Sequence, residues 1–210
     1  MRRYVMKRLI LCVLALFCFA CGCQKEEITP MAAIQQKLTD MEGYSCLATL
    51  TIYSNKGETV YETKQDFKST GEYRMEMLSP DSAKGNYTVF DGKTVCQYNP
   101  RLKESVQREV PESQRRNELF LGQFLKNYLQ SEGVSVETAA IDESRCTVLE
   151  AFIPENGSQL ASEKLWVDNE SLLPVRLSLY DAHGKECLRL DYTTFTYNPH
   201  FDENLFRIPA

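Results

Sequence analysis

Hydrophobic residues are unevenly distributed along the 210-residue chain and begin with an uninterrupted run at residues 9–20. This run follows a basic segment, residues 1–8, which contains four Lys and Arg side chains and no acidic one. A membrane-spanning helix needs about 20 apolar residues, so the run is too short to span and is typical of a secretory signal. We therefore expect residues 1–20 to be a signal peptide.

Beyond residue 43 the hydrophobic period is two, which is typical of half-buried strands. Tyr44, Cys46 and Ala48 share one face of the first such segment, with polar or small residues between them. Asp91-Gly92, between two short runs, is a strong hairpin signal. Ten strands are expected, at residues 44–52, 58–68, 71–78, 86–90, 93–98, 134–138, 146–153, 164–167, 175–180 and 186–196.

Two segments have helical spacing instead. Thr29 can cap a helix that begins at Pro30, a position where the missing backbone N–H costs nothing. A second helix is expected after Pro111 and before Gly133, which is well placed to end it. Its apolar stripe consists of Leu121, Phe124, Leu125, Tyr128 and Leu129.

These elements predict an α+β fold that is mainly β. Helices do not alternate with strands, so the sheet should be antiparallel, with the two helices covering one face. We see no internal repeat or linker beyond residue 28. Residues 29–210 should therefore form one domain, joined to the signal by a tether at residues 21–28.

Charge narrows the possible partners. The net charge is −5, and without the four basic residues of positions 1–20 the remaining chain carries −9. An acidic surface argues against binding nucleic acid, because phosphates are neutralised by Lys and Arg. With only two histidines in the chain, we also expect no metal site and no cofactor.

Two cysteines directly follow the apolar run. Residues 19–24 (FACGCQ) resemble the lipobox of bacterial lipoproteins, in which a small residue precedes a cysteine that receives lipid and becomes the new N-terminus. Ala20 favours Cys21 as the lipidated, palmitate-bearing residue, and Gly22 leaves Cys23 as the alternative. Two or three acyl chains suffice for stable anchoring, so the resemblance implies a protein tethered on the extracytoplasmic face of the cell membrane.

The expected body contains four further cysteines: Cys46, Cys96, Cys146 and Cys187. None belongs to a CxxC pair, so neither a zinc site nor a thioredoxin-like site is indicated. Each lies in a strand pattern, which favours a role as a small apolar core residue. Export permits disulfides, but the sequence does not choose among the three possible pairings.

Sequence motifs for catalysis are missing. The chain has no nucleophile elbow, zinc-protease helix, P-loop or dinucleotide-binding motif. His183 and His200 both lie in expected turns, where backbone conformation explains them. Glu62 and Asp66 lie on a charged strand face and are expected at a solvated edge. We therefore expect that the protein is not an enzyme.

The C-terminal stretch, residues 163–209, resembles the C-terminal half of the LolA-like outer-membrane lipoprotein-sorting superfamily. The similarity rests on residues 165–168 (LWVD), 173–176 (LPVR), 180–185 (YDAHGK) and 205–209 (LFRIP), and upstream on 73–76 (YRME), 91–93 (DGK) and 98–100 (YNP). Within the superfamily, residues 41–46 (MEGYSC) combined with the lipobox are most similar to the clostridial germination lipoprotein GerS group.

The superfamily resemblance implies a curved antiparallel half-barrel, closed by helices, with an apolar concave face. A GerS-like role implies binding and activating a spore-cortex N-acetylmuramoyl-L-alanine amidase, CwlD, that is needed for cortex modification and germination, in the spore envelope. The alternative is LolA- or LolB-like binding of lipid or lipoprotein acyl chains. A lipid-anchored protein cannot leave the membrane as a shuttle does, which favours partner binding.

Three points stay open in the sequence. Trp166 and the stripe of the second helix could line a lipid cavity or simply pack in the core. The residues that contact a partner are not indicated. A homodimer is also possible.

Overall fold

The structure is a computed structural model that describes residues 29–131, 136–141, 144–154 and 160–209. Its helices are α2 (Pro30–Thr39) and α3 (Leu121–Gln130), with a 3-10 helix η2 (Glu112–Gln114). The strands are β1 (Gly43–Ser54), β2 (Gly57–Lys68), β3 (Tyr73–Ser79), β4 (Tyr87–Phe90), β5 (Thr94–Asn99), β6 (Glu104–Glu109), β7 (Val136–Ile141), β8 (Ser144–Phe152), β9 (Ser162–Asp168), β10 (Pro174–Tyr180) and β11 (Glu186–Tyr197).

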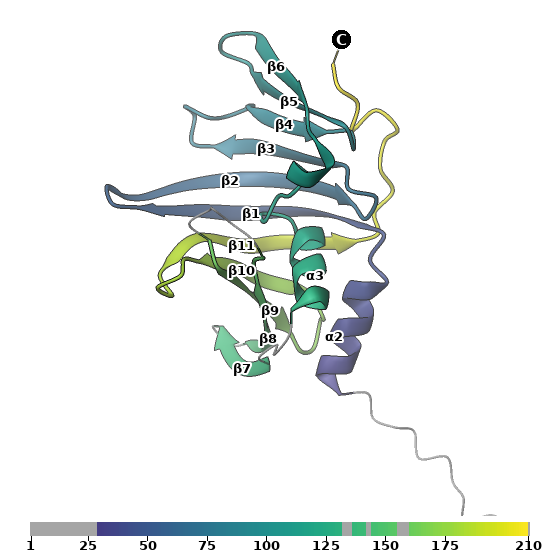
Figure 1. Cartoon of the computed structure of the whole chain (residues 1–210), viewed down its shortest axis with the longest axis vertical. Coiled ribbons are helices and arrows are strands. Elements are labelled where there is room, and N and C mark those ends of the chain that lie inside the picture. Colours follow the sequence, from purple (N-terminus) through teal and green to yellow (C-terminus); the bar gives the residue numbers. More distant parts are fainter. Residues whose placement is uncertain (1–28, 132–135, 142–143, 155–159, 210) are drawn as a thin grey trace, which may run out of the picture.

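All described strands belong to one curled antiparallel sheet with the order β6-β5-β4-β3-β2-β1-β11-β10-β9-β8-β7 (Figure 1). The strands pair with their neighbours in sequence, except that β1 pairs with β11. Strands β6 and β7 follow one another in sequence but lie at opposite edges. The chain between them therefore crosses the sheet, and it forms η2 and α3 on the way. This arrangement confirms the predicted fold class.

The core lies between the concave face of the sheet and the two helices. Successive side chains of a strand point to opposite faces of the sheet, and Leu50 of β1, Leu190 of β11 and Leu165 of β9 point to the concave face. All three are at most 2% exposed. Ile34 and Phe124 reach the same cluster from α2 and α3. The expected cap of the first helix is confirmed, because the Thr29 side chain accepts a hydrogen bond from the Ala32 N–H.

The outer face of the sheet carries ion pairs as well as buried apolar residues such as Val89 and Val148. Arg176 of β10 and Asp191 of β11 are opposite one another in the ladder and form an ion pair of 2.6 Å. Trp166 also lies on this face, since it alternates with Leu165 and Val167 of the concave core. It therefore does not share a face with the helix stripe, and the suggestion that the two line one cavity is wrong.

Strand β6 was not predicted from the sequence. Its residues, ESVQRE, are all exposed, so the hydrophobic alternation that marks the other strands is absent. It forms a ladder with β5 alone and is an edge of the sheet.

The prediction that Asp66 lies at a solvated edge is also wrong. Strand β2 is central, between β1 and β3. The Asp66 side chain is buried on the outer side of this strand, where it accepts a hydrogen bond of 2.7 Å from the Ser45 hydroxyl. Glu62, in contrast, is exposed as expected.

The predicted stripe of α3 is correct at Leu121, Phe124 and Tyr128 and wrong at Leu129, which is 69% exposed. Asn127 is buried in its place, since its amide has a polar partner on the sheet. Gly133, the predicted signal peptide and the predicted tether lie outside the described residues.

Gly122 allows α3 to approach the sheet closely. A Cβ atom at this position would overlap the ring of Phe67 on β2. That ring is packed between Tyr44 and Phe120, with centroids 5.5 and 6.0 Å away, so it has little freedom to move aside.

We predict that Gly122→Ala lowers the free energy of unfolding by about 1–2 kcal/mol, because overpacking outweighs the higher helix propensity of alanine. Chemical denaturation measures the change. Leu129→Ala, on the exposed side of the same helix, is the control and should change stability by less than about 0.5 kcal/mol. Equal stability of Gly122→Ala and the unmodified protein would contradict the close contact.

Candidate functional site

The two helices divide the concave face into a covered half and an open half. Their buried side chains cluster with residues of β1 and of β8 to β11, as the positions of α2 and α3 in Figure 1 also show. The concave face of β3 to β6 lies beyond α2 and α3, with only the short η2 segment against part of it. The open half is therefore accessible to a partner or ligand.

Polar groups in the covered half fix the start of α3. The Tyr44 hydroxyl on β1 accepts a hydrogen bond from the Leu121 N–H at 3.3 Å and donates one to Gln65 Oε1 at 3.2 Å. Leu121 is the first residue of the helix, so its N–H has no partner within α3. The tyrosine satisfies it and attaches the helix to the sheet.

A buried carboxyl group lies under the middle of α3. Glu163 of β9 is fully buried, and its Oε1 accepts a hydrogen bond of 2.6 Å from the Asn127 amide. Asn127 Oδ1 in turn accepts hydrogen bonds from Arg116 and Gln123. Glu163 Oε2 has no hydrogen-bond partner among the described residues. Burial raises the pKa of Glu163 to about 8, an effect that the hydrogen bond from Asn127 only partly opposes.

This raised pKa predicts a pH dependence of stability. Between the ordinary pKa of glutamate and pH 8, the folded state holds a proton on Glu163 that the unfolded state has lost, so stability falls as pH rises through this range. We expect Glu163→Gln, which is neutral at every pH, to remove this part of the slope in denaturation series from pH 5 to 9.

Glu62→Gln, at an exposed position of β2, should leave the slope unchanged and serves as the control. A Glu163→Gln variant with the same pH slope as the unmodified protein would show that this carboxyl group does not titrate as described.

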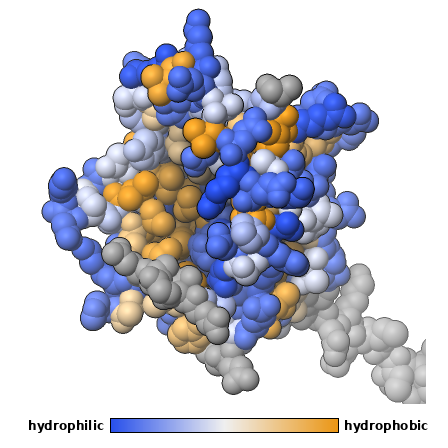
Figure 2. Space-filling view, turned by 45° about the horizontal axis from the view of Figure 1, so that its top comes forward, coloured by the Kyte–Doolittle hydropathy of each residue, from blue (hydrophilic) through white to orange (hydrophobic). Residues whose placement is uncertain are grey.

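The open half contains three adjoining pockets of about 320, 300 and 340 Å³. The outermost is lined by Met75 and Met77 of β3 and by Leu102 and Val106 at β6. Leu102 and Val106 are 66% and 70% exposed. We call this methionine-lined surface the open groove. Figure 2 shows apolar surface gathered in a hollow between hydrophilic lobes on the concave side of the molecule.

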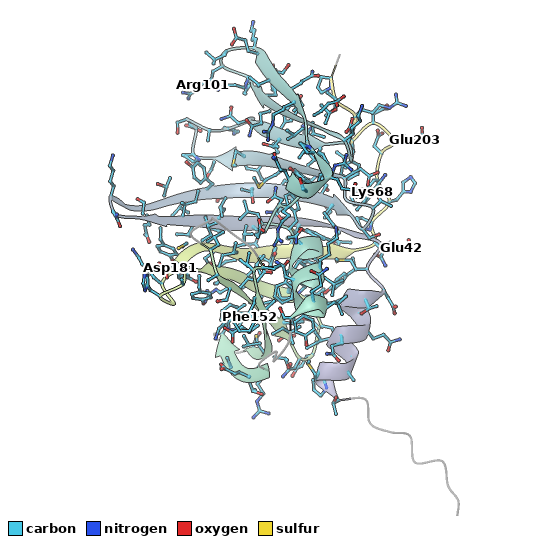
Figure 3. The ribbon with its side chains drawn as sticks, viewed as in Figure 1. Glu42, Lys68, Arg101, Phe152, Asp181 and Glu203 are labelled. Carbon is cyan, nitrogen blue, oxygen red and sulfur yellow. The ribbon has the colours of Figure 1, made fainter. Side chains whose placement is uncertain are left out.

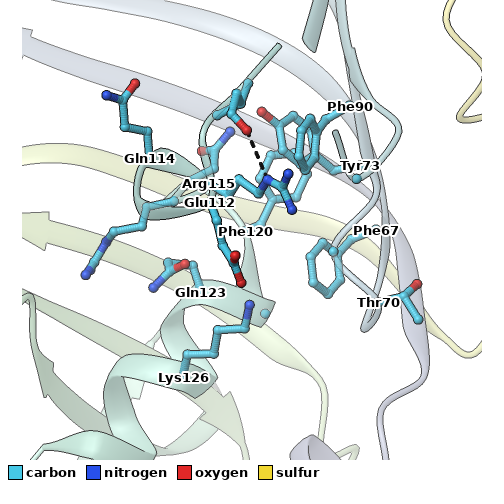
Figure 4. Close-up of a pocket in the computed structure, with 16 residues that line it drawn as sticks. Phe67, Thr70, Tyr73, Phe90, Glu112, Gln114, Arg115, Phe120, Gln123 and Lys126 are labelled. Carbon is cyan, nitrogen blue, oxygen red and sulfur yellow. Dashed lines mark hydrogen bonds between the residues drawn. The ribbon is translucent and has the colours of Figure 1, made fainter. Parts of the chain in front are cut away.

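The pocket nearest to α3 has a different chemistry. Arg115, Arg116 and Lys126 line it together with aromatic side chains from β2, β3 and β4 (Figure 4). We call it the basic pocket. The sequence analysis did not identify this pocket, because the sheet residues that complete it lie far from Arg115, Arg116 and Lys126 in the chain.

The candidate residues singled out in the sequence lie elsewhere. His183 and His200 are exposed outside the strands, as expected. The thiols Cys46, Cys96 and Cys146 are buried, Cys187 is half-buried, and all four are free. Cys21 and Cys23 lie outside the described residues. Burial at the first three positions confirms their interpretation as core residues.

Two features are absent from the described part of the chain. No group of three or more His, Cys, Asp or Glu side chains is arranged to hold a metal ion. No helix has both the length and the apolar character needed to cross a membrane.

The curled antiparallel sheet, partly covered by helices on its concave face, defines a class of half-barrel proteins. Within it, the chain belongs to the YdcC-like sporulation protein family, whose model matches residues 6–206. A curated relative is Sporulation protein YdcC of Bacillus subtilis, which is 21% identical over 187 residues. The match covers 89% of this chain and 54% of the relative, so the chain spans about half the relative's length.

Solved structures resemble the fold. A conserved protein of Thermus thermophilus matches with a TM-score of 0.54 and 17% identity, over 85% of this chain and 94% of that one. The GerS lipoprotein of Clostridioides difficile, solved with the CwlD amidase, matches with a TM-score of 0.49 and 28% identity, over 84% and 98%. LolA superfamily and lipoprotein-sorting proteins also match, at TM-scores of 0.43 and 0.46.

Proposed function

We propose that this protein is a non-catalytic sporulation lipoprotein that binds a cortex amidase on the extracytoplasmic side of the membrane and supports its activity. The observation that carries the proposal is membership of the YdcC-like sporulation family. The amidase is suggested by the similarity of residues 41–46 and the lipobox to the GerS group.

The open groove has the chemistry of a protein-binding surface. Unbranched Met75 and Met77 can adapt to different partner side chains. Exposed Val106 of β6 and Leu102 of the preceding turn add apolar area beside them, and β6 has no described strand along its outer edge. Contiguous exposed apolar surface of this kind is typical of interaction sites. We place the amidase contact here.

We predict that the full-length protein binds the amidase of its own organism and that Val106→Asp weakens this binding about tenfold or more, because a buried charge at an interface is costly. Isothermal titration calorimetry measures the affinity. Val60→Asp is the matched control: Val60 is 45% exposed but lies on the outer face of β2, and this change should leave the affinity unchanged.

Failure of the unmodified protein to bind the amidase, with no change in amidase activity, would overturn the proposal. Equal effects of the two aspartate variants would move the contact away from the open groove.

Binding of acyl chains is the second candidate function. It is favoured by the half-buried hydrophobic residues Ile52, Tyr61 and Leu188 on the concave face. Acyl ligands seen by native mass spectrometry, without an amidase complex, would support it.

The anchor is a separate proposal, supported by the sequence of residues 19–24. We expect Cys21→Ala to abolish metabolic labelling with palmitate and to release the protein from the membrane fraction, because the cysteine thiol carries the lipid. Cys46→Ala, at a buried position of β1, is a control that should stay labelled. Persistent labelling of Cys21→Ala would assign the lipid to Cys23.

A further inference from the structure

The basic pocket lies where α3 begins, between the η2 segment and the ends of β2, β3 and β4. It has a volume of about 320 Å³, which suits a small ligand. Figure 4 shows its side chains converging from the sheet on one side and from η2 and α3 on the other.

Arg115 is positioned to bind an anion. Its Nε donates a hydrogen bond of 3.0 Å to the Val110 carbonyl, which orients the guanidinium toward Tyr73 and Phe90 (Figure 4). The two terminal nitrogens form no hydrogen bond with the described residues, and Arg115 takes part in no ion pair between them. A guanidinium held at Nε can offer its terminal N–H groups to both oxygens of a carboxylate.

The neighbouring cations differ in their availability. Arg116 is occupied, because its Nε pairs with Glu118 at 3.0 Å and a terminal nitrogen donates to Asn127 at 3.1 Å. Lys126, like Arg115, takes part in no ion pair between described residues. One acid, Glu112, lines the pocket and points toward Lys126 in Figure 4. The uncompensated positive charge is therefore greatest at Arg115.

The wall behind Arg115 is aromatic. The ring centroid of Tyr73 lies 5.3 Å from that of Phe90 and 4.5 Å from that of Phe120. Such a wall lowers the local dielectric constant and strengthens a charge pair formed against it. Gln114, Asn117 and Gln123 add neutral amides that can bind hydroxyl or acetamido groups.

We propose that the basic pocket binds a small carboxylic acid, with the carboxylate on Arg115 and the body of the ligand among the aromatic rings and amides. Two sources share this chemistry. One is N-acetylmuramic acid, since hydrolysis of the muramoyl–alanine amide breaks the C–N bond, leaves a carboxylate on the sugar and releases the alanine nitrogen as an amine. The other is a fatty acid. The first source rests on the proposed function.

The test is saturation-transfer NMR and titration of the full-length protein in nanodiscs with three probes. N-acetylmuramic acid should bind, and N-acetylglucosamine, which lacks the carboxylate, should bind at least about tenfold more weakly. Arg115→Gln should remove this difference. Arg101→Gln is the matched control: Arg101 is also exposed and bonded to one carbonyl, that of Asp81, but lies at the other end of the β5–β6 hairpin (Figure 3).

Binding of both sugars with equal affinity, or unchanged acid binding by Arg115→Gln, would overturn the proposal, as would no binding of any acid. Hexanoate is the third probe. If it binds through Arg115 while N-acetylmuramic acid does not, the carboxylate site stands with a fatty acid as its source. Thermal unfolding checks that each variant is folded. These titrations contain no amidase, so their failure is distinct from failure of the amidase proposal.

Discussion

The structure depends on one topological constraint: strands β6 and β7 are consecutive in sequence but form opposite edges of the same sheet. The chain between them has to cross a face of that sheet, and α3 is the crossing segment (Figure 1). An apolar sheet face needs a covering layer, and the crossing helix supplies it together with α2. Because the two helices cover only the strands beneath them, the concave face of β3 to β6 stays open.

Helix α3 is held on the sheet by hydrogen bonds of defined geometry as well as by apolar packing. Gly122 allows a close approach to Phe67, and the Tyr44 hydroxyl satisfies the first N–H of the helix. The bond between Asn127 and Glu163 requires burial of a carboxyl group, which costs stability, yet it forms in only one position of the helix along the sheet. We infer that these polar contacts set the position of α3, and with it the boundary between the covered and open halves.

Local signals predicted much of this fold. Period-two patterns identified ten strands, and Thr29-Pro30 identified the start of α2, because neighbouring residues encode these features. Strand β6 gives no such signal, since every residue in it is exposed. Asn127 and Glu163 are 36 positions apart, so their pairing follows from the tertiary fold. The basic pocket could not be predicted for the same reason: Arg115 was visible in the sequence, but its aromatic neighbours were not.

The acidic character of the chain is compatible with an anion site inside it. At physiological ionic strength, exposed charges are largely screened beyond about 8 Å, so the excess of Asp and Glu on distant surfaces has little effect within the pocket. A carboxylate that enters responds chiefly to Arg115 and Lys126, beside an aromatic wall that limits screening. The same excess still repels anionic polymers and lipid surfaces from the body as a whole. This charge distribution supports the proposals of a small acid in the basic pocket and of a protein partner at the apolar open groove.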